Sequence, residues 1–268
     1  MLGDATRERI YRWAVAKFDL TDDEIDDEIA DGVRFYFKSH GPTLADYHGV
    51  YVWRMEPVTI ISTPSDFKTG IIITLIHAYN QPGGVIHALD LHDPFDALVE
   101  PEFWRAAMGE RLERVVGPSY QGFVDADAFQ PADEQGARAL TPDDQPALQQ
   151  FIAACPPDAW KDSAIALDHD PIFGLERDGD LIALASAPLD GIADGSADEG
   201  VRSVGVVTLP AWRGQGAALA VVAALTARCL ASGALLHYQT LRANLPSAAI
   251  ARRLGYEEVA TALAIRLR

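Results

Sequence analysis

The chain has 268 residues, of which 49% are hydrophobic and 23% charged, so its composition is that of a globular protein with a substantial core. Its formal net charge of −17 argues against nucleic acid or an anionic membrane as partner, because both are polyanions. The sequence contains no run of about 18 apolar residues, no signal peptide and only two cysteines, so we expect a cytoplasmic protein.

The first half of the chain alternates predicted helices with β-branched runs that predict strands. Helices are expected at 7–18, 21–32, 65–79 and 102–116, and strands at 34–37, 49–53, 58–62 and 120–125. Two histidines and two aspartates gather in segment 87–93 and could form a metal site, but turn polarity explains them better, and we predict no metal.

A polar stretch with Pro and Gly follows at 125–136, as is typical of a domain boundary. We therefore expect a smaller N-terminal α/β domain over 1–132 and a second domain over 133–268. In the second domain, strands are expected at 137–140, 171–175, 181–187, 204–208 and 235–241, and helices at 141–154, 217–230 and 244–254.

A glycine loop connects the strand at 204–208 to the helix at 217–230. Gly214 and Gly216 allow close backbone approach, and the free N–H groups at the helix start form an anion site beside Arg213. Residues 201–268 carry eight arginines and two glutamates, a formal +6 in an otherwise acidic chain. The sequence therefore predicts a polyanionic ligand, such as a phosphorylated cofactor, at this loop.

This loop resembles motif A of the GNAT acetyltransferase superfamily, Arg/Gln-x-x-Gly-x-Gly/Ala, with Arg213, Gly216 and Ala218 at the matching positions. In that family the loop holds the pyrophosphate of acetyl-CoA, and the preceding strand binds the pantetheine arm through its backbone. The resemblance implies the following CoA-binding residues in the strand and loop: Val206, Thr208, Arg213, Gly214, Gln215, Gly216, Ala217 and Ala218.

A second stretch resembles motif B of the same superfamily, Asn-x-x-Ala/Ser-x-x-Leu-Tyr-x-x-Leu-Gly-Phe. It begins at Asn244 and Ser247, which can cap a helix and turn polar atoms toward pantetheine, and ends at Gly255 and Tyr256. The two motifs imply an α+β fold, with a mixed sheet flanked by helices. They also suggest a subgroup that carries an extra N-terminal α/β domain, which would form a wall of the acceptor site or a homodimer contact.

The match fails where many relatives have a tyrosine that protonates the leaving CoA thiolate, because here that position is Ala251. Tyr238, Tyr256 or water would replace it. The base is also open: Ser203 with a water, His237, or an acid from the segment 190–199 could serve. For each of these residues a packing or surface role is the alternative.

The resemblance implies an N-acyltransferase that moves an acyl group, expected to be acetyl, from acetyl-CoA to an amine of a small molecule or protein. Direct attack in a ternary complex is the expected mechanism. The main alternative is a non-catalytic acyl-CoA-binding or sensing module, since the usual tyrosine is missing. A weaker alternative is a protein-interaction role for the N-terminal domain, attached to a remnant enzyme.

Overall fold

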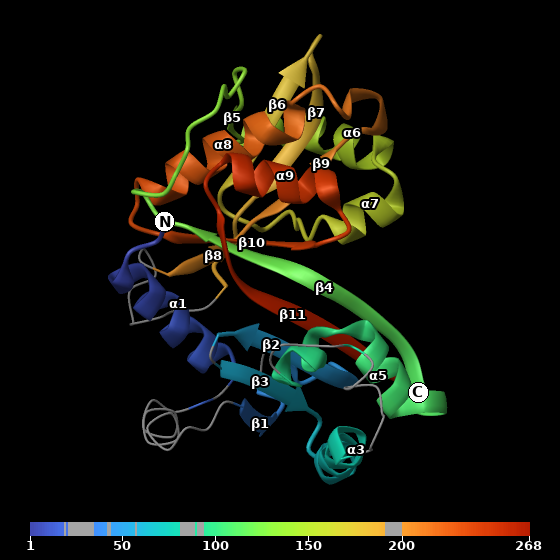
Figure 1. Ribbon diagram of the computed structural model, residues 1–268. Coiled ribbons are helices and arrows are strands. Elements are labelled where there is room, and N and C mark those ends of the chain that lie inside the picture. The colour runs from blue at the N-terminus through green and yellow to red at the C-terminus, as the bar shows by residue number, and fades with distance from the viewer. Residues whose placement is uncertain are drawn as a thin grey trace. The chain divides into compact units, whose positions relative to one another are not determined.

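The computed structural model describes residues 1–18, 20, 35–41, 44–56, 58–80, 89, 94–190 and 200–268 (Figure 1). The helix expected at 21–32 and the polar side chains of segment 87–93 lie outside the described residues. The chain forms two compact units, each assembled from segments distant in sequence. The first unit comprises 1–9, 122–239 and 245–257, and the second comprises 10–121, 240–244 and 258–268. The expected boundary at 132 and 133 stays a prediction.

Helices and strands alternate through most of the described chain. The helices are α1 (Asp4–Lys17), α3 (Lys68–Asn80), α5 (Pro101–Met108), α6 (Gln145–Ala154), α7 (Pro157–Asp162), α8 (Ala217–Leu230) and α9 (Leu245–Arg253). The strands are β1 (Phe35–Ser39), β2 (Gly49–Met55), β3 (Val58–Thr63), β4 (Leu112–Val124), β5 (Arg138–Ala139), β6 (Ile172–Arg177), β7 (Asp180–Ser186), β8 (Val201–Ser203), β9 (Gly205–Thr208), β10 (Leu235–Leu241) and β11 (Glu257–Leu267).

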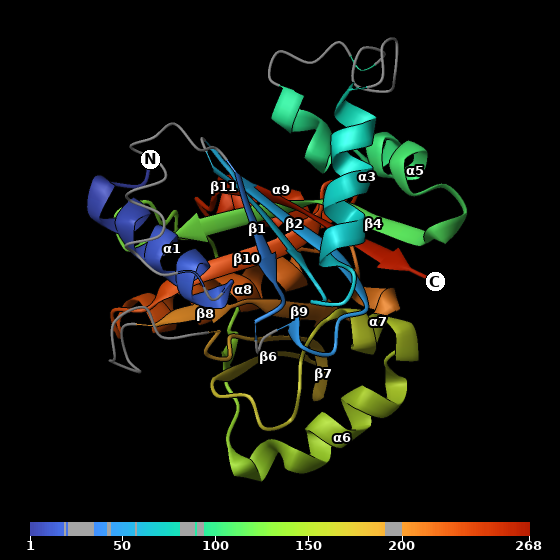
Figure 2. The same ribbon diagram turned by 90° about the horizontal axis from the view of Figure 1, so that it is seen from below.

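The second unit is built on neighbouring strands in the order β1-β3-β2-β11-β4. β1 pairs parallel with β3, whereas β2 pairs antiparallel with both β3 and β11. Helices α3 and α5 contact each other in this unit, as Figure 2 shows. The core beneath them includes Val52, Ile61, Phe103, Trp104 and Leu263, all fully or almost fully buried.

The helix expected at 102–116 is wrong in its second half. α5 ends at Met108, and Gly109 follows with a positive φ of 54°, a backbone conformation that favours glycine. From Leu112 the chain is strand β4, a neighbour of β11. The spacing of apolar residues after Met108 is compatible with a helix or with a strand, and pairing with neighbouring strands of the sheet selects the strand.

The first unit contains the four-stranded sheet β5-β6-β7-β9, whose strands are all antiparallel to their neighbours. Helices α8 and α6 both contact β7 and lie on opposite faces of it (Figures 1 and 2). Leu184 and Val207 pack with Phe151 of α6. α8 is almost entirely Ala, Leu and Val and has ten buried residues, as its composition predicts. The α+β class with a mixed sheet flanked by helices is thereby confirmed.

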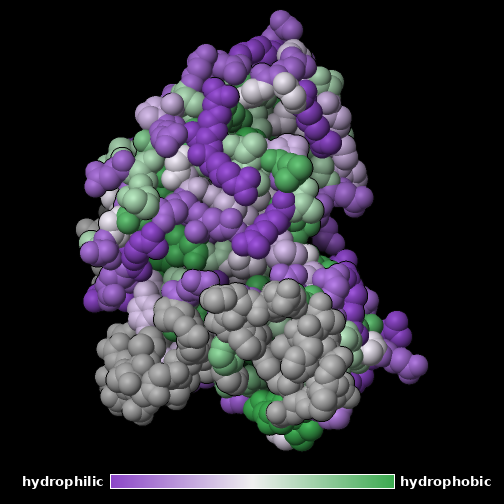
Figure 3. Space-filling model, in the orientation of Figure 1, coloured by the Kyte–Doolittle hydropathy of each residue, from purple (hydrophilic) through white to green (hydrophobic). Residues whose placement is uncertain are grey.

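The surface of α3 is apolar on its outer side. Ile73 and Ile76 are 62% and 57% exposed. Figure 3 shows a hydrophobic patch at its lower edge, where Figure 1 places α3. The opposite side of the same helix buries Ile71 and Leu75 in the core. Within the described residues, no helix combines the length and the apolar character needed to cross a membrane.

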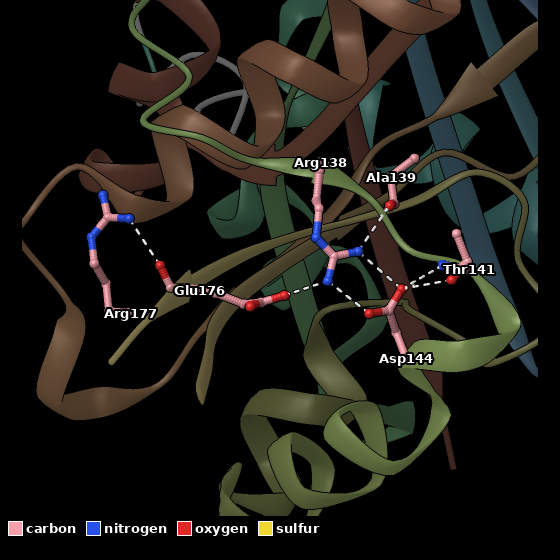
Figure 4. Close-up of polar contacts among 6 residues, drawn as sticks. All are labelled: Arg138, Ala139, Thr141, Asp144, Glu176 and Arg177. Atoms are coloured by element: carbon pink, nitrogen blue, oxygen red, sulfur yellow. Dashed lines mark hydrogen bonds and ion pairs between the residues drawn. The ribbon is translucent and has the colours of Figure 1, made fainter. Parts of the chain in front are cut away.

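One ion-pair cluster joins β5 to the turn before α6 (Figure 4). Two Arg138 nitrogens donate to the carboxylate of Asp144, at 2.7 and 2.9 Å, and Arg138 also pairs with Glu176 on β6. The same carboxylate accepts the N–H of Thr141 at 2.7 Å. Its hydrogen bonds with Arg138 and then with Thr141 hold the pKa of Asp144 well below its usual range.

We predict that Asp144→Asn lowers the Tm at neutral pH, by an amount equivalent to up to about 1 kcal/mol, because this cluster is partly solvated. A depressed carboxyl pKa stabilises the fold above the unfolded pKa of about 3.9, and this stabilisation is lost as pH falls. The Tm difference between variant and wild type, followed by calorimetry from pH 7 to pH 3, should therefore shrink below about pH 4.

The neighbouring Asp143→Asn serves as the control, since no hydrogen bond or ion pair involves the Asp143 side chain in the described part of the chain. It should leave the Tm unchanged at both pH values. A Tm difference for Asp144→Asn that stayed constant with pH would show that the carboxylate charge is not what stabilises this joint.

Candidate functional site

The residues predicted to bind pantetheine lie where the chain changes its partner strand. β8 pairs parallel with β10, placing Ser203 opposite His237, and the N–H of Val204 donates to the carbonyl of His237 at 2.8 Å. One residue later the chain becomes β9, which pairs antiparallel with β7. The same run of chain therefore belongs first to one sheet and then to the edge of another.

The orientation of the β9 backbone follows from its register. The N–H of Leu209 donates to the carbonyl of Ile182 at 3.0 Å, in line with the pairing of β7 and β9. In an antiparallel pair, residues alternate between bonding their partner strand and pointing away from it. Val206 and Thr208 consequently direct their N–H and C=O groups away from β7, toward the open edge. The Thr208 carbonyl indeed accepts from Nε of Arg213, at 3.2 Å.

The predicted phosphate loop has the backbone that its glycines allow. Gly214 and Gly216 have φ values of 75° and 84°, and Gly216 is the N-cap residue of α8. The Gln215 side chain folds back onto the loop backbone, since its Nε2 donates to the carbonyl of Ala211 at 3.0 Å. From Arg213 to Gly216 the loop is exposed, while Ala217 is buried and Ala218 half-buried at the start of α8.

Sequence reasoning missed a side chain that reaches this loop. Nε2 of Gln135 lies 3.0 Å from where a Cβ on Gly216 would sit. Arg177 holds the Gln135 carboxamide by donating to its Oε1 at 2.9 Å, which leaves the NH₂ end directed at the loop. No local pattern marks Gln135, which lies in the expected linker, so only the folded chain brings this extra donor to the helix start.

Three polar residues named as alternative bases converge at the end of β8. Ser203 Oγ donates to Asp190 Oδ2 at 2.6 Å and lies 3.1 Å from Nδ1 of His237. His237 Nδ1 is 3.8 Å from the same carboxylate oxygen. The His237 ring is 1% exposed and stacks on Phe123, with ring centroids 4.6 Å apart. Of the segment 190–199, only Asp190 is among the described residues.

The two candidate tyrosines have different surroundings. The Tyr238 hydroxyl is 3.0 Å from Oγ of Ser247, in the first turn of α9, whereas the Tyr256 hydroxyl bonds Thr226 of α8 at 2.8 Å. Both rings are buried and meet edge to face. Burial raises the pKa of Tyr238, and the bond to Ser247 offsets this in part, so the phenol keeps its proton at neutral pH.

Two further predicted positions complete the description. Ala251 is fully buried in α9, so a tyrosine could not be added there without displacing its neighbours. Asn244 falls in the other unit, where its N–H donates to the carbonyl of Leu241 at 2.9 Å. Among the described residues no three His, Cys, Asp or Glu side chains gather as a metal-binding group.

Comparison with known proteins shows what one part of the chain is similar to. Residues 138–256 match the model of the Acetyltransferase (GNAT) family. No curated protein matches the chain. Residues 138–256 therefore form a domain that matches the GNAT acetyltransferases, a family of acyl-CoA-dependent N-acetyltransferases. The resemblance read from the two sequence motifs is confirmed.

Several solved structures are similar to this chain, each with low sequence identity. A GNAT-family acetyltransferase from Novosphingobium aromaticivorans is 23% identical over 58% of this chain and 66% of its own, with a TM-score of 0.43. One from Colwellia psychrerythraea is 16% identical over 62% and 61%, with a TM-score of 0.45. A GCN5-related N-acetyltransferase from Kribbella flavida is 22% identical over 70% and 80%, with a TM-score of 0.42. The chain thus spans less than two thirds of the first two proteins.

Gly255, which ends α9, should be the least replaceable glycine of this unit. Its φ is 87°, and an added Cβ would lie 2.1 Å from the carbonyl oxygen of Ala128. Gly214 has a similar φ, but a Cβ there meets nothing within 4 Å. We predict that both alanine variants lose about 1–2 kcal/mol to left-handed strain, and that Gly255→Ala loses about 1–3 kcal/mol more through the clash.

Urea unfolding of the two variants measures the difference, because the backbone strain is common to both and cancels. Equal midpoints for Gly214→Ala and Gly255→Ala would show that the Ala128 carbonyl does not pack against Gly255.

Proposed function

We propose that this protein transfers an acyl group, expected to be acetyl, from acyl-CoA directly to an amine in a ternary complex. The observation that carries the proposal is the geometry of β9 and the loop after it. The edge of β9 at which Val206 and Thr208 point their backbone groups away from β7 leads into a glycine loop at a helix start. The strand edge suits the pantetheine arm of CoA, and the loop suits its pyrophosphate.

The pyrophosphate of CoA would lie against the loop from Arg213 to Ala218. Helix N-termini present N–H groups without intrahelical partners and a partial positive charge, which together favour phosphate. Arg213 adds a charged donor, and the Gln135 carboxamide near Gly216 adds an N–H. The acidic character of the rest of the chain does not extend here, since residues 201–268 carry eight arginines and two glutamates.

The pantetheine arm, with its two amides, would pair with the open backbone edge at Val206 and Thr208. In support, Thr208 Oγ1 is buried and hydrogen-bonds to none of the described residues, as expected for a polar atom beside an amide-bearing ligand. Ser247, which lies in the same unit as β9, keeps the role near pantetheine that the second motif suggests. A backbone N–H of β9 near Val206 would then stabilise the oxyanion that forms on the thioester carbonyl.

Direct attack is favoured over an acyl-cysteine intermediate by the state of the two thiols. Cys155 and Cys229 are buried, and burial raises the pKa of both, that of Cys229 to about 11. A thiol must ionise to act as a nucleophile. Neither cysteine is therefore prepared to accept the acyl group.

Tyr238 is the better of the two candidate acids for the CoA thiolate. It retains its proton at neutral pH, and its hydroxyl points to Ser247, a predicted CoA-binding residue. The Tyr256 hydroxyl is instead engaged with Thr226 of α8. The buried Ala251 at the usual tyrosine position supports the second candidate function, a non-catalytic acyl-CoA-binding module.

Gly216→Asp tests the CoA site. The carboxylate would stand where phosphate is expected, so we predict that calorimetry shows CoA affinity lower by at least about tenfold, or 1.4 kcal/mol. Gly179→Asp is the matched control, because Gly179 also has a positive φ, of 89°, with open space around it in the β6–β7 turn. If the two folded variants bound CoA equally well, the loop would not be the pyrophosphate site.

Variants of Tyr238 and Tyr256 distinguish an enzyme from a non-catalytic binding module. We predict that Tyr238→Phe lowers kcat by about 10²-fold or more, the usual contribution of a general acid. Tyr256→Phe should leave kcat unchanged and lower stability by about 1 kcal/mol, since it removes the partner of buried Thr226. CoA release with a panel of amines is the assay. A wild-type protein that binds CoA but releases no thiol with any amine would support the binding module.

A further inference from the structure

We propose that Asp190, Ser203 and His237 form the acceptor site for a cationic amine and take up the proton that this amine must lose. The inference rests on the proposed acyl transfer. The three side chains meet at the point where the chain passes from β8 to β9, one residue before the strand that would hold the thioester.

An alkyl amine has a pKa near 10, so at pH 7 it arrives as an ammonium ion without a lone pair. It must therefore transfer a proton before it can attack a thioester carbonyl. Acyl transfer to such an acceptor needs two features close together: a negative charge that binds the ammonium, and a base that takes its proton.

Asp190 supplies the accessible charge. Its side chain is 25% exposed, whereas the His237 ring behind it is buried. The carboxylate is held in place by backbone pairing: the N–H of Asp190 donates to the carbonyl of Val201 at 2.7 Å, and the N–H of Ser203 donates to that of Pro188 at 3.1 Å. The short antiparallel bridge between Leu189 and Arg202 belongs to the same arrangement.

Ser203 lies between the carboxylate and the imidazole. Its hydroxyl has one proton and two lone pairs, and in the structure it donates to Asp190. When an ammonium N–H replaces it at the carboxylate, the hydroxyl can turn its proton to Nδ1 of His237, 3.1 Å away. The ammonium then passes a proton to Ser203 Oγ while the serine proton moves to His237, and the amine becomes neutral.

The charge count stays constant through this step. One N–H bond of the ammonium breaks and one N–H bond forms on the imidazole, so a positive charge moves inward by one hydroxyl. Asp190 Oδ2, 3.8 Å from Nδ1, balances the charge at both ends. The Phe123 ring, stacked on the imidazole, presents a face that also favours a cation.

Arg202, the residue before Ser203, does not take the place of the ammonium ion at Asp190. Arg202 Nη1 donates to the backbone carbonyls of Asp170 and Ala187, at 2.9 and 2.8 Å, and not to Asp190. After attack, the Tyr238 hydroxyl protonates the departing CoA thiolate, and the second proton of the nitrogen replaces the one that Tyr238 gave. The products are the amide, CoA thiol and one proton, which His237 returns to solvent through Ser203.

The test compares two acceptors in the full-length protein: an alkyl amine, charged at pH 7, and an aromatic amine, uncharged at pH 7. Ser203→Ala should lower kcat by about 10²-fold or more for the alkyl amine and have little effect for the aromatic amine, which needs no deprotonation before attack. Ser203→Thr, which keeps the hydroxyl, should restore activity. Asp190→Asn should raise KM for the alkyl amine alone, and His237→Gln, which changes a positioning residue acting through Ser203, should lower kcat alone.

Ser186→Ala is the matched control. Ser186 is a buried serine in the same unit whose Oγ is 2.9 Å from Nδ1 of His169. It should leave both reactions unchanged. Equal losses for both amines with Ser203→Ala, or failure of threonine to rescue, would overturn the relay and leave a structural serine.

A binding measurement distinguishes failure of this inference from failure of the proposed function. If the wild-type protein transfers no acyl group, butylamine added to the CoA-bound protein should still shift the His237 ring signals in NMR spectra, and this shift should disappear in Asp190→Asn. Absence of the shift in the wild type would overturn the acceptor site even where acyl transfer is observed.

Discussion

The domain that matches the GNAT family depends on one feature of its backbone: over residues 201–208 the chain pairs first with β10 and then with β7. It leaves β10 at Val204 and joins β7 at Gly205. A strand that changes partner leaves backbone donors and acceptors at the point of separation, and unpaired buried groups cost about 1–3 kcal/mol each. Such a place is stable when a ligand or water supplies the missing hydrogen bonds, which is what an amide-bearing cofactor does.

This change of partner strand also positions the candidate site residues before and after Val204. Before Val204, Ser203 lies opposite His237 because β8 and β10 pair in parallel. After it, β9 runs straight to the glycine loop and the start of α8. The acceptor, thioester and phosphate sites would therefore follow one another along the chain, at Ser203, at Val206 and Thr208, and at the loop from Arg213 to Ala218. In the proposed complex, the positive end of α8 and Arg213 would bind the anionic cofactor, and Asp190 would bind the cationic amine.

Several helices and strands could be predicted because their signals are local. α8 follows from a run of Ala, Leu and Val, and Gly214 and Gly216 have the left-handed φ values that only glycine adopts without strain. The prediction of a helix at 102–116 was wrong in its second half because no local signal there distinguishes a helix from a strand. Its second half has a local pattern that fits either structure, and β4 exists because it is a neighbour of β11, more than a hundred residues later.

The amino-acid sequence by itself predicted the GNAT resemblance, the glycine loop at the start of α8 and the helices of the two motifs, since each depends on residues a few positions apart. Only the tertiary structure decided which polar side chains meet. Asp190, Ser203 and His237 are separate alternatives in the sequence and one hydrogen-bonded cluster in the fold, and Gln135 reaches Gly216 from a segment without a local signal. Strand pairing sets such contacts, and pairing depends on residues far apart in the chain, which no local pattern records.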